Sequence, residues 1–141
     1  MVDVVDDLFQ RRGVARSTAI AQLRGEVTDY AESLGAPGGV LDNVRLAVSE
    51  ALTNIVMHAY AGRDPGDMIV EAWCDEDEHL VVRVCDEGHG LIPRTDSSGL
   101  GIGIGLMASM ADTFRIANRD GTPGTIVSMR FSLCPESVCV N

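Results

Sequence analysis

The chain has 141 residues, of which 45% are hydrophobic and 23% charged, and this ordinary globular composition argues against a disordered or membrane-spanning protein. The formal net charge of −10 argues against direct nucleic-acid binding and leaves a basic protein as a suitable partner. All eleven basic residues are arginine, which excludes the Walker A lysine, the strand lysine of ordinary protein kinases and Schiff-base chemistry.

The cysteines and the first residues bear on location. Cys74, Cys85, Cys134 and Cys139 form no Cys-x-x-Cys pair and have no histidine at zinc-finger spacing, so we expect free thiols. The first seven residues are acidic where a secretory signal would be basic, and no apolar run reaches the length of a bilayer span. We therefore expect a cytoplasmic protein that does not contact a membrane.

The first part of the chain has helical periodicity. Residues 1–16 are weakly patterned, and we expect an N-terminal arm or an edge strand around Val2–Val5. Ser17 is a suitable N-cap, and apolar residues recur at helical spacing to Leu34, before a glycine-rich stretch ends the pattern. A second helix is expected from about Val40 to Tyr60, where a turn rich in glycine and proline follows.

The rest of the chain has mainly the periodicity of β-strands, apart from one short helical segment. The order of these elements favours an α+β fold, with helices packed on one face of a largely antiparallel sheet. We assign residues 17–133 to this domain and residues 134–141 to a C-terminal tail. Strands are expected at Met68–Cys74, Leu80–Cys85, Thr113–Ala117 and Thr125–Leu133, and a third helix from Leu106 to about Asp112.

A polar stripe marks the second helix. Glu50, Asn54 and His58 recur every four residues and so share one side of the helix, along the border of its apolar face. Polar groups at such a border are costly to desolvate without partners, so the stripe indicates a lined cleft. A partly exposed amphipathic helix is the alternative. A neutral amide between a carboxylate and an imidazole does not favour a transition-metal site.

A second motif follows the strand that ends at Asp86. Gly88 and Gly90 come next at alternating positions, so the backbone can turn sharply and approach a ligand. A carboxylate at this point can accept a hydrogen bond from an exocyclic amine at the bottom of a pocket. An ordinary glycine-rich turn after a strand is the alternative.

A third motif consists of Gly99, Gly101, Gly103 and Gly105, which we expect to form a loop before the third helix. Bare backbone N–H groups and a helix N-terminus both attract phosphate. The spacing is not that of a Rossmann fingerprint, because in both registers an apolar branched residue occupies the third glycine position. A flexible loop or close helix–sheet packing is the alternative. The polar segment Leu91–Ser98 is expected to form a mobile lid.

These motifs resemble, in this order, the GHKL ATP-binding fold of histidine kinases, DNA gyrase and MutL. Gly124-Thr125, before the last strand, looks like a fourth motif of that superfamily, and the resemblance covers about residues 15–133. Within it, the pattern Glu-x-x-x-Asn-x-x-x-His-x-Tyr is similar to that of bacterial anti-sigma factor serine/threonine kinases. The resemblance implies a two-layer α/β sandwich whose mixed, mostly antiparallel sheet carries helices on one face.

The resemblance also implies roles for individual residues. Asn54 would hold Mg²⁺, and Glu50 would be the base for a substrate hydroxyl. Asp86, together with Thr125, would read the adenine amino group of ATP. The other implied contacts are made by glycines: Gly88 and Gly90 beside the base, and Gly99, Gly101 and Gly103 over the phosphates. His58 and Tyr60 match the motif and are expected to be structural.

Kinases of this family bind a sigma factor, phosphorylate a small antagonist protein on Ser or Thr, and are often dimeric. We therefore expect an anti-sigma factor that uses Mg-ATP in this way, with a homodimer among the expected states. A nucleotide-binding module that sequesters its partner without phosphotransfer is one alternative, against which Glu50 argues. The catalytic domain of a histidine kinase is another, and it would need a phospho-accepting helical hairpin before residue 1.

Overall fold

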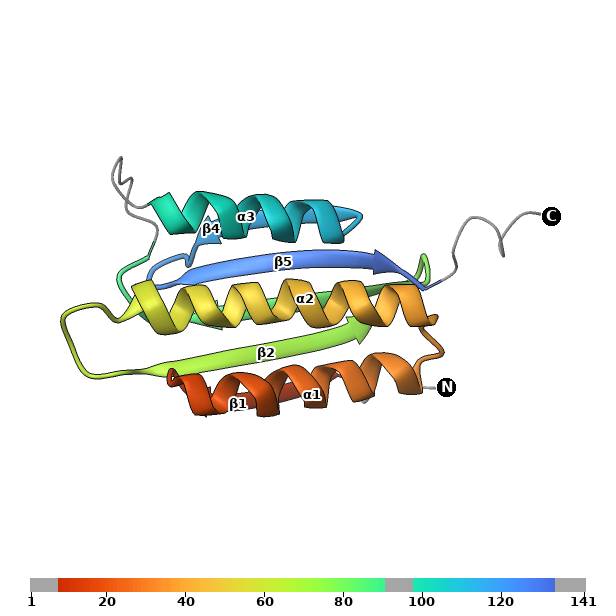
Figure 1. Cartoon of the computed structure of the whole chain (residues 1–141), viewed down its shortest axis with the longest axis horizontal. Helices are drawn as coiled ribbons and strands as arrows, with labels where there is room; N and C mark the ends of the chain where they lie inside the picture. Colours follow the sequence, from red (N-terminus) through yellow and green to blue (C-terminus); the bar gives the residue numbers. More distant parts are fainter. Residues whose placement is uncertain (1–7, 91–97, 134–141) are drawn as a thin grey trace.

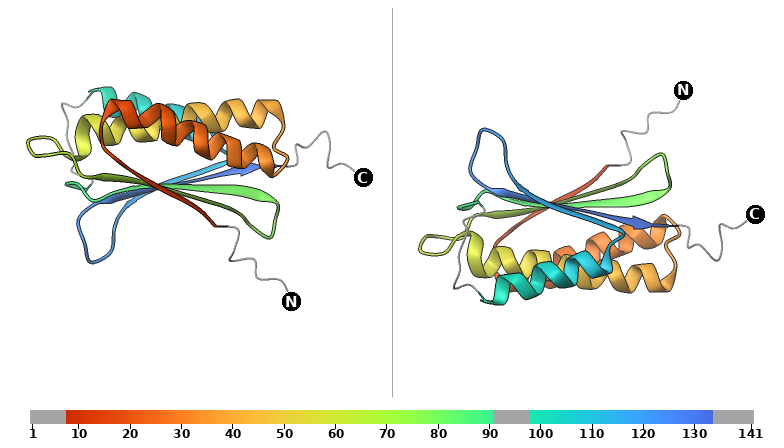
Figure 2. Two further views of the ribbon diagram at one scale, coloured as in Figure 1. Left: turned by 90° about the horizontal axis from the view of Figure 1, so that it is seen from below. Right: turned by 90° about the horizontal axis from the view of Figure 1, so that it is seen from above.

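The computed structural model describes residues 8–90 and 98–133, which form two layers (Figure 1). Three helices in these ranges lie on one face of a five-stranded sheet, and Figure 2 shows the other face of the sheet free of helices within the described chain. The expected α+β architecture is confirmed. The elements are β1 (Phe9–Val14), α1 (Ser17–Ser33), α2 (Gly38–Asn54), β2 (Asp67–Cys74), β3 (His79–Asp86), α3 (Ser98–Met110), β4 (Thr113–Asn118) and β5 (Thr125–Ser132).

The strand order of the sheet, β1-β2-β3-β5-β4, decides which motifs meet. The sheet was expected to be mixed, but all four pairings between described strands are antiparallel. The central pair joins β3 to β5, although α3 and β4 separate these strands in the sequence. In this register Asp86, at the end of β3, lies opposite Thr125, at the start of β5. The second and fourth motifs therefore come together where these two inner strands end.

The core between the layers follows the predicted apolar faces. Helix α2 buries Val44, Ala47, Val48, Ala51 and Leu52 against the sheet, as its periodicity indicated. Helix α1 begins where predicted, but its N-cap is Arg16, which has extended backbone angles, and Ser17 is already the first helical residue.

The second helix does not continue regularly to Tyr60. Helix α2 ends at Asn54, and Ile55–Ala59 form a π-helical turn, labelled η2. A π turn contains one more residue per hydrogen-bonded ring than an α turn, so the regular spacing from Asn54 to His58 is interrupted. The carbonyl of Ala59 accepts the N–H of His89 at 2.9 Å, which ties this turn to the loop after β3.

The prediction that the four glycines form a loop before the third helix is wrong. Helix α3 starts at Ser98 rather than near Leu106, so the glycine run forms its first turns. The reason is tertiary, because α3 packs along α2 and Met107 is fully buried. Packing of this kind outweighs a helix penalty of about 1 kcal/mol for each glycine.

Some predictions fall on other parts of the chain. The edge strand within residues 1–16 is Phe9–Val14, and Val2–Val5 lie outside the described residues. The expected lid lies outside them up to residue 97, as does the tail 134–141 with its two cysteines. Cys74 and Cys85 are free thiols. None of the helices in the described ranges has the length and apolarity needed to cross a bilayer.

Candidate functional site

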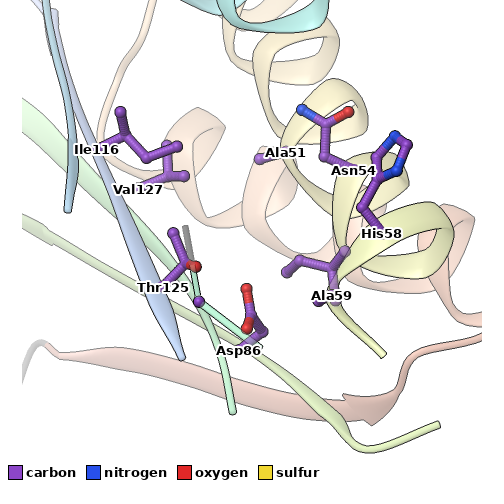
Figure 3. Close-up of a pocket in the computed structure, with 10 residues that line it drawn as sticks. Ala51, Asn54, His58, Ala59, Asp86, Ile116, Thr125 and Val127 are labelled. Atoms are coloured by element: carbon purple, nitrogen blue, oxygen red, sulfur yellow. The ribbon is translucent and has the colours of Figure 1, made fainter. Parts of the chain in front are cut away.

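A pocket lies between the end of α2, the turn η2 and the strand ends of the sheet (Figure 3). Its volume is about 80 Å³, below the roughly 300–1,000 Å³ of pockets that enclose a whole drug-sized ligand. The described residues therefore enclose space for only one part of a ligand of that size. The lining consists of Ala51, Asn54, Ile55, His58, Ala59, Asp86, Gly90, Ile116, Thr125 and Val127.

Asp86 lies on the floor of the pocket, at the end of β3. Its exposed fraction is 4%, and its Oδ1 accepts the N–H of Gly88 at 2.8 Å. Figure 3 shows its carboxylate and the side chain of Thr125 projecting from neighbouring strands into the same space. Burial raises the pKa of Asp86, whereas hydrogen bonds from the backbone of Gly88 and Thr125 and the charges of Arg119 and Arg63 act against that rise.

The arrangement can recognise an amine. A carboxylate has more acceptor sites than the hydrogen bond from Gly88 uses, and the pocket is the space into which Asp86 faces. A buried carboxylate left without donors is costly, so a ligand that donates from an amino group is favoured over one that presents a carbonyl.

Two glycines are required by close backbone contacts rather than by a ligand alone. A Cβ on Gly88 would lie 2.1 Å from the carbonyl oxygen of Ala59, so Gly88 lets β3 approach η2. A Cβ on Gly124 would lie 2.1 Å from the carbonyl oxygen of Asp86, and Gly124 has a φ of +132°. We call Asp86, Gly88, Gly124 and Thr125 the strand-end corner.

Two of the three residues of the polar stripe line the pocket. Asn54 and His58 line it from the helical side, and Figure 3 shows their side chains next to each other at its rim. Glu50 is half-buried one helical turn before Asn54 and is not among the lining residues. The structure thus brings five predicted residues together: Asn54, His58, Asp86, Gly90 and Thr125.

Metal binding is limited by the available ligands. Among the described residues, no group of three or more His, Cys, Asp or Glu side chains could hold a metal ion. Mg²⁺ commonly takes only one or two protein ligands and completes its shell with phosphate oxygens and water. The amide oxygen of Asn54 fits this second arrangement, in which the metal binds together with a nucleotide.

Tyr60 has a structural role, as expected. Its hydroxyl donates to the carbonyl of Asp67 at 2.7 Å and accepts the N–H of Glu87 at 2.8 Å. A Cβ on Gly66 would lie 2.5 Å from the ring, so this glycine makes room for it. Tyr60 therefore joins the start of β2 to the residue that follows β3.

Two apolar residues that line the pocket and one arginine next to it were not predicted from the sequence. Ile116 and Val127 line the pocket from β4 and β5, although their alternation indicated only a buried strand face. Val127 could have been predicted from its position, because it lies two residues from Thr125 and alternate residues of a strand share one face. Arg119 lies behind the pocket, and no local pattern marks it.

Comparisons with known proteins agree with this geometry. The model of the family described as histidine kinase-like ATPase domain matches residues 14–131. The anti-sigma F factor of Clostridium acetobutylicum is 27% identical over 138 residues, which cover 90% of this chain and 94% of that protein. The serine-protein kinase RsbW of Bacillus subtilis is 28% identical over 130 residues, which cover 82% and 81% of the two chains.

A solved structure has the same fold. The RsbU and RsbW domains of a Mycobacterium tuberculosis protein match with a TM-score of 0.68 at 20% identity. The match covers 89% of this chain and 32% of that one, so this chain spans about a third of its length. At this identity the likeness concerns the fold.

Proposed function

The chain belongs to the histidine kinase-like ATPase domain family, and from this membership we propose that it is an anti-sigma factor that phosphorylates an antagonist protein with Mg-ATP. The observation that carries the proposal is the strand-end corner, where a buried carboxylate faces a pocket lined by Asn54 and His58. The relatives named anti-sigma F factor and serine-protein kinase support it.

In this proposal the strand-end corner recognises the adenine base. Asp86 accepts a hydrogen bond from the exocyclic amine of adenine, with Thr125 beside it, and Gly90 leaves room at the pocket mouth. Ile116 and Val127 supply apolar surface for the ring. GTP presents a carbonyl at the position of the amine, so the base would offer no donor to the acceptor sites of Asp86 that the backbone hydrogen bonds leave open.

Phosphate binding falls to Asn54 and the start of α3. Mg²⁺ held by Asn54 would neutralise charge on the phosphates. The N–H groups of the N-cap and of the first three helical residues have no partners within a helix, and in α3 these include Gly99. Gly101 and Gly103 lie beyond them, so their N–H groups can reach a phosphate only if the first turn of α3 opens.

Phosphotransfer needs a group that orients or deprotonates the substrate hydroxyl. Glu50 lies one helical turn from Asn54 and outside the pocket lining, where a protein substrate could reach it. We assign this role to Glu50 and expect the hydroxyl of a serine or threonine in the antagonist to be the acceptor.

The partners in this proposal are a sigma factor and the antagonist, with a second copy of the chain as a further partner. The net charge of −10 suits a basic partner surface and not nucleic acid. The reaction is placed in the cytoplasm, where ATP and these partners meet.

The test is transfer of labelled phosphate from Mg-ATP to candidate antagonists by the parent chain and by Glu50→Gln. The variant keeps the shape of the side chain, so it should still bind nucleotide and sigma factor while transfer slows by roughly 10²–10⁴-fold. Asp42→Asn, which changes an exposed carboxylate of the same helix, is the control and should leave the rate unchanged.

Two other results would change the assignment. If Glu50→Gln transfers phosphate as fast as the parent, another group is the base. If the parent retains a sigma factor on a column but phosphorylates no antagonist, the sequestering module is the correct function.

A further inference from the structure

Arg119 lies behind the floor of the pocket, where the turn after β4 begins. It lines a groove on the sheet face opposite the helices, together with Glu87 and Ile126. Its backbone N–H donates to the carbonyl of Gly124 at 3.0 Å, and its side chain is 28% exposed. The side chain runs back toward the end of β3, on which Asp86 stands.

Two contacts join the guanidinium of Arg119 to that strand end. Its Nη1 donates to the carbonyl oxygen of Asp86 at 3.5 Å and lies 3.6 Å from Oε2 of Glu87. The stem packs at Gly124, because its Cδ lies 2.7 Å from the place of a Cβ there. One side chain therefore contacts both strands of the strand-end corner.

We propose that Arg119 is a positioning residue for the pocket: from the far side of the sheet it fixes the end of β3 and places a positive charge behind the Asp86 carboxylate, which accepts hydrogen bonds in the pocket. The proposal rests on the proposed function, in which Asp86 accepts from an adenine amine. It adds a cation outside the pocket that widens the pH range over which this recognition works.

The physical need for such a cation comes from burial. Removing a carboxylate from water disfavours its charged form, and a nearby positive charge favours it. Burial raises the pKa of Asp86. Hydrogen bonds from the backbone of Gly88 and Thr125 oppose that rise first, and the charges of Arg119 and then Arg63 add to them. Arg63 is exposed and donates to the carbonyl of Glu87 at 3.5 Å, so solvent screens it more than the partly buried Arg119.

Several other groups around Asp86 titrate or carry charge, and they are present in every variant compared below. From β2 and β3 these are Asp67 and Cys85; from the turn after α2 and the following loop, His58, Tyr60 and Arg63; and from the loop after β3, Glu87 and His89. A measurement at the Asp86 carboxyl itself separates its titration from theirs.

The sign of the effect follows from the chemistry. An amine donor binds the ionised carboxylate, so nucleotide affinity is full above the pKa of Asp86 and falls as the pH is lowered through it. Without the charge of Arg119 that pKa is higher. Affinity would then be lost at a higher pH than in the parent.

The first arm of the test uses the chain without nucleotide. The ¹³C NMR signal of the Asp86 carboxyl, assigned by its loss in Asp86→Asn, is followed against pH. Arg119→Met keeps the stem beside Gly124 and removes the charge, and should move the inflection up by as much as about one pH unit. Arg119→Lys keeps a charge and should titrate close to the parent. Arg115→Gln, which changes an exposed arginine of β4, the strand that Arg119 follows, should do the same.

The second arm measures ADP affinity against pH by calorimetry with the same variants. The pH of half-maximal affinity should rise in Arg119→Met and not in Arg115→Gln. If circular dichroism shows Arg119→Met to be unfolded, Arg119→Gln takes its place. An inflection at the parental pH in the folded variant overturns the role of Arg119.

The two arms separate this inference from the proposed function. If the parent does not bind ADP, the proposed function fails, while the carboxyl titration still decides whether Arg119 controls Asp86. If ADP binds and both inflections stay in place, the inference alone is wrong.

Discussion

The two ends of the site are built differently. The strand-end corner is held by strand register, by a hydrogen bond at 2.8 Å and by backbone contacts that leave no room for a Cβ at Gly124. The first half of α3 is rich in glycine, and at Gly105 no neighbouring atom lies within 4 Å of an added Cβ. Close contacts therefore require glycine at Gly124 in the strand-end corner, but they do not require it at Gly105 in α3.

In the proposed function, this difference separates recognition of the base from binding of the phosphates. The strand-end corner is fixed by the register of β3 and β5 and by close backbone contacts, so a base that fits it loses little free energy to rearrangement. At α3 the helix uses its own hydrogen bonds beyond the first turn, so a contact from Gly103 requires local opening. Glycine makes such opening inexpensive.

The largest effect is expected from a methyl group in the strand-end corner. Gly124→Ala combines a positive φ with a Cβ 2.1 Å from the carbonyl of Asp86, so the free energy of unfolding should fall by about 3 kcal/mol and nucleotide binding should be lost. Urea denaturation measures the first effect and calorimetry the second. Gly121→Ala, in the same hairpin with a φ of +74° and open space, should cost only about 1 kcal/mol. Equal losses would contradict a rigid corner.

Asp86→Asn tests recognition without changing the shape of the corner. It removes a charged acceptor, so ATP affinity should fall by roughly 10- to 100-fold and the preference for ATP over GTP should decrease. Calorimetric titration with both nucleotides measures the change. A variant that still prefers ATP as strongly as the parent would move recognition of the base away from Asp86.

Asn54→Ala tests the boundary between the two ends. Because Asn54 is the expected protein ligand of Mg²⁺ and only half-buried, the variant should fold and lose about tenfold in Mg-dependent ATP affinity. Affinity measured with excess chelator serves as the control and should be the same in both proteins. Unchanged affinity with Mg²⁺ would assign the metal to another group.

Asp86→Asn should also change stability in a pH-dependent way. Burial raises the pKa of Asp86, so its contribution to stability is present at pH values below its ordinary pKa and is lost as the pH rises through the raised value. At neutral pH the variant, which has no buried charge, should therefore melt above the parent, and the gap should close at acidic pH. Thermal melts at the two pH values check this, and a gap that widens on acidification would refute it.

The smallest effect is expected at Gly105. This residue is exposed inside α3 with open space around it, so Gly105→Ala should raise the free energy of unfolding by about 0.5–1 kcal/mol. If the start of α3 must open over the phosphates, the same variant should bind ATP more weakly while binding adenosine as before. Equal changes for both ligands would show that α3 stays closed.

The sequence predicted those features that depend on local periodicity. The stripe on α2, both strands of the β2–β3 hairpin and the strand-end position of Asp86 follow from spacings within single elements. The π turn at Ile55–Ala59 could not be predicted in this way, because the local sequence continues a helical pattern and the turn is tied to His89 from a distant segment.

The start of α3 and the position of Arg119 could not be predicted from the sequence, for a related reason. Four glycines within seven residues favour a loop locally, but contact with α2 makes them helical. Arg119 reaches Asp86 only because β3 and β5 are neighbours in the sheet. Both features depend on which elements pack together, and residue spacing within one segment does not contain that information.

The pairing of Asp86 with Thr125 also affects how proteins of this architecture can diverge. The chain leaves the sheet after Asp86, returns first on β4 at the edge of the sheet, and then enters β5 at Thr125, opposite the point where it left. Each doubling of the length of a connection costs only about 0.6 kcal/mol in loop-closure entropy, so insertions between Gly90 and α3 need not disturb the register of the central strands. Access for a protein substrate can therefore evolve by insertion and deletion while the strand-end corner, the proposed site of base recognition, is inherited unchanged.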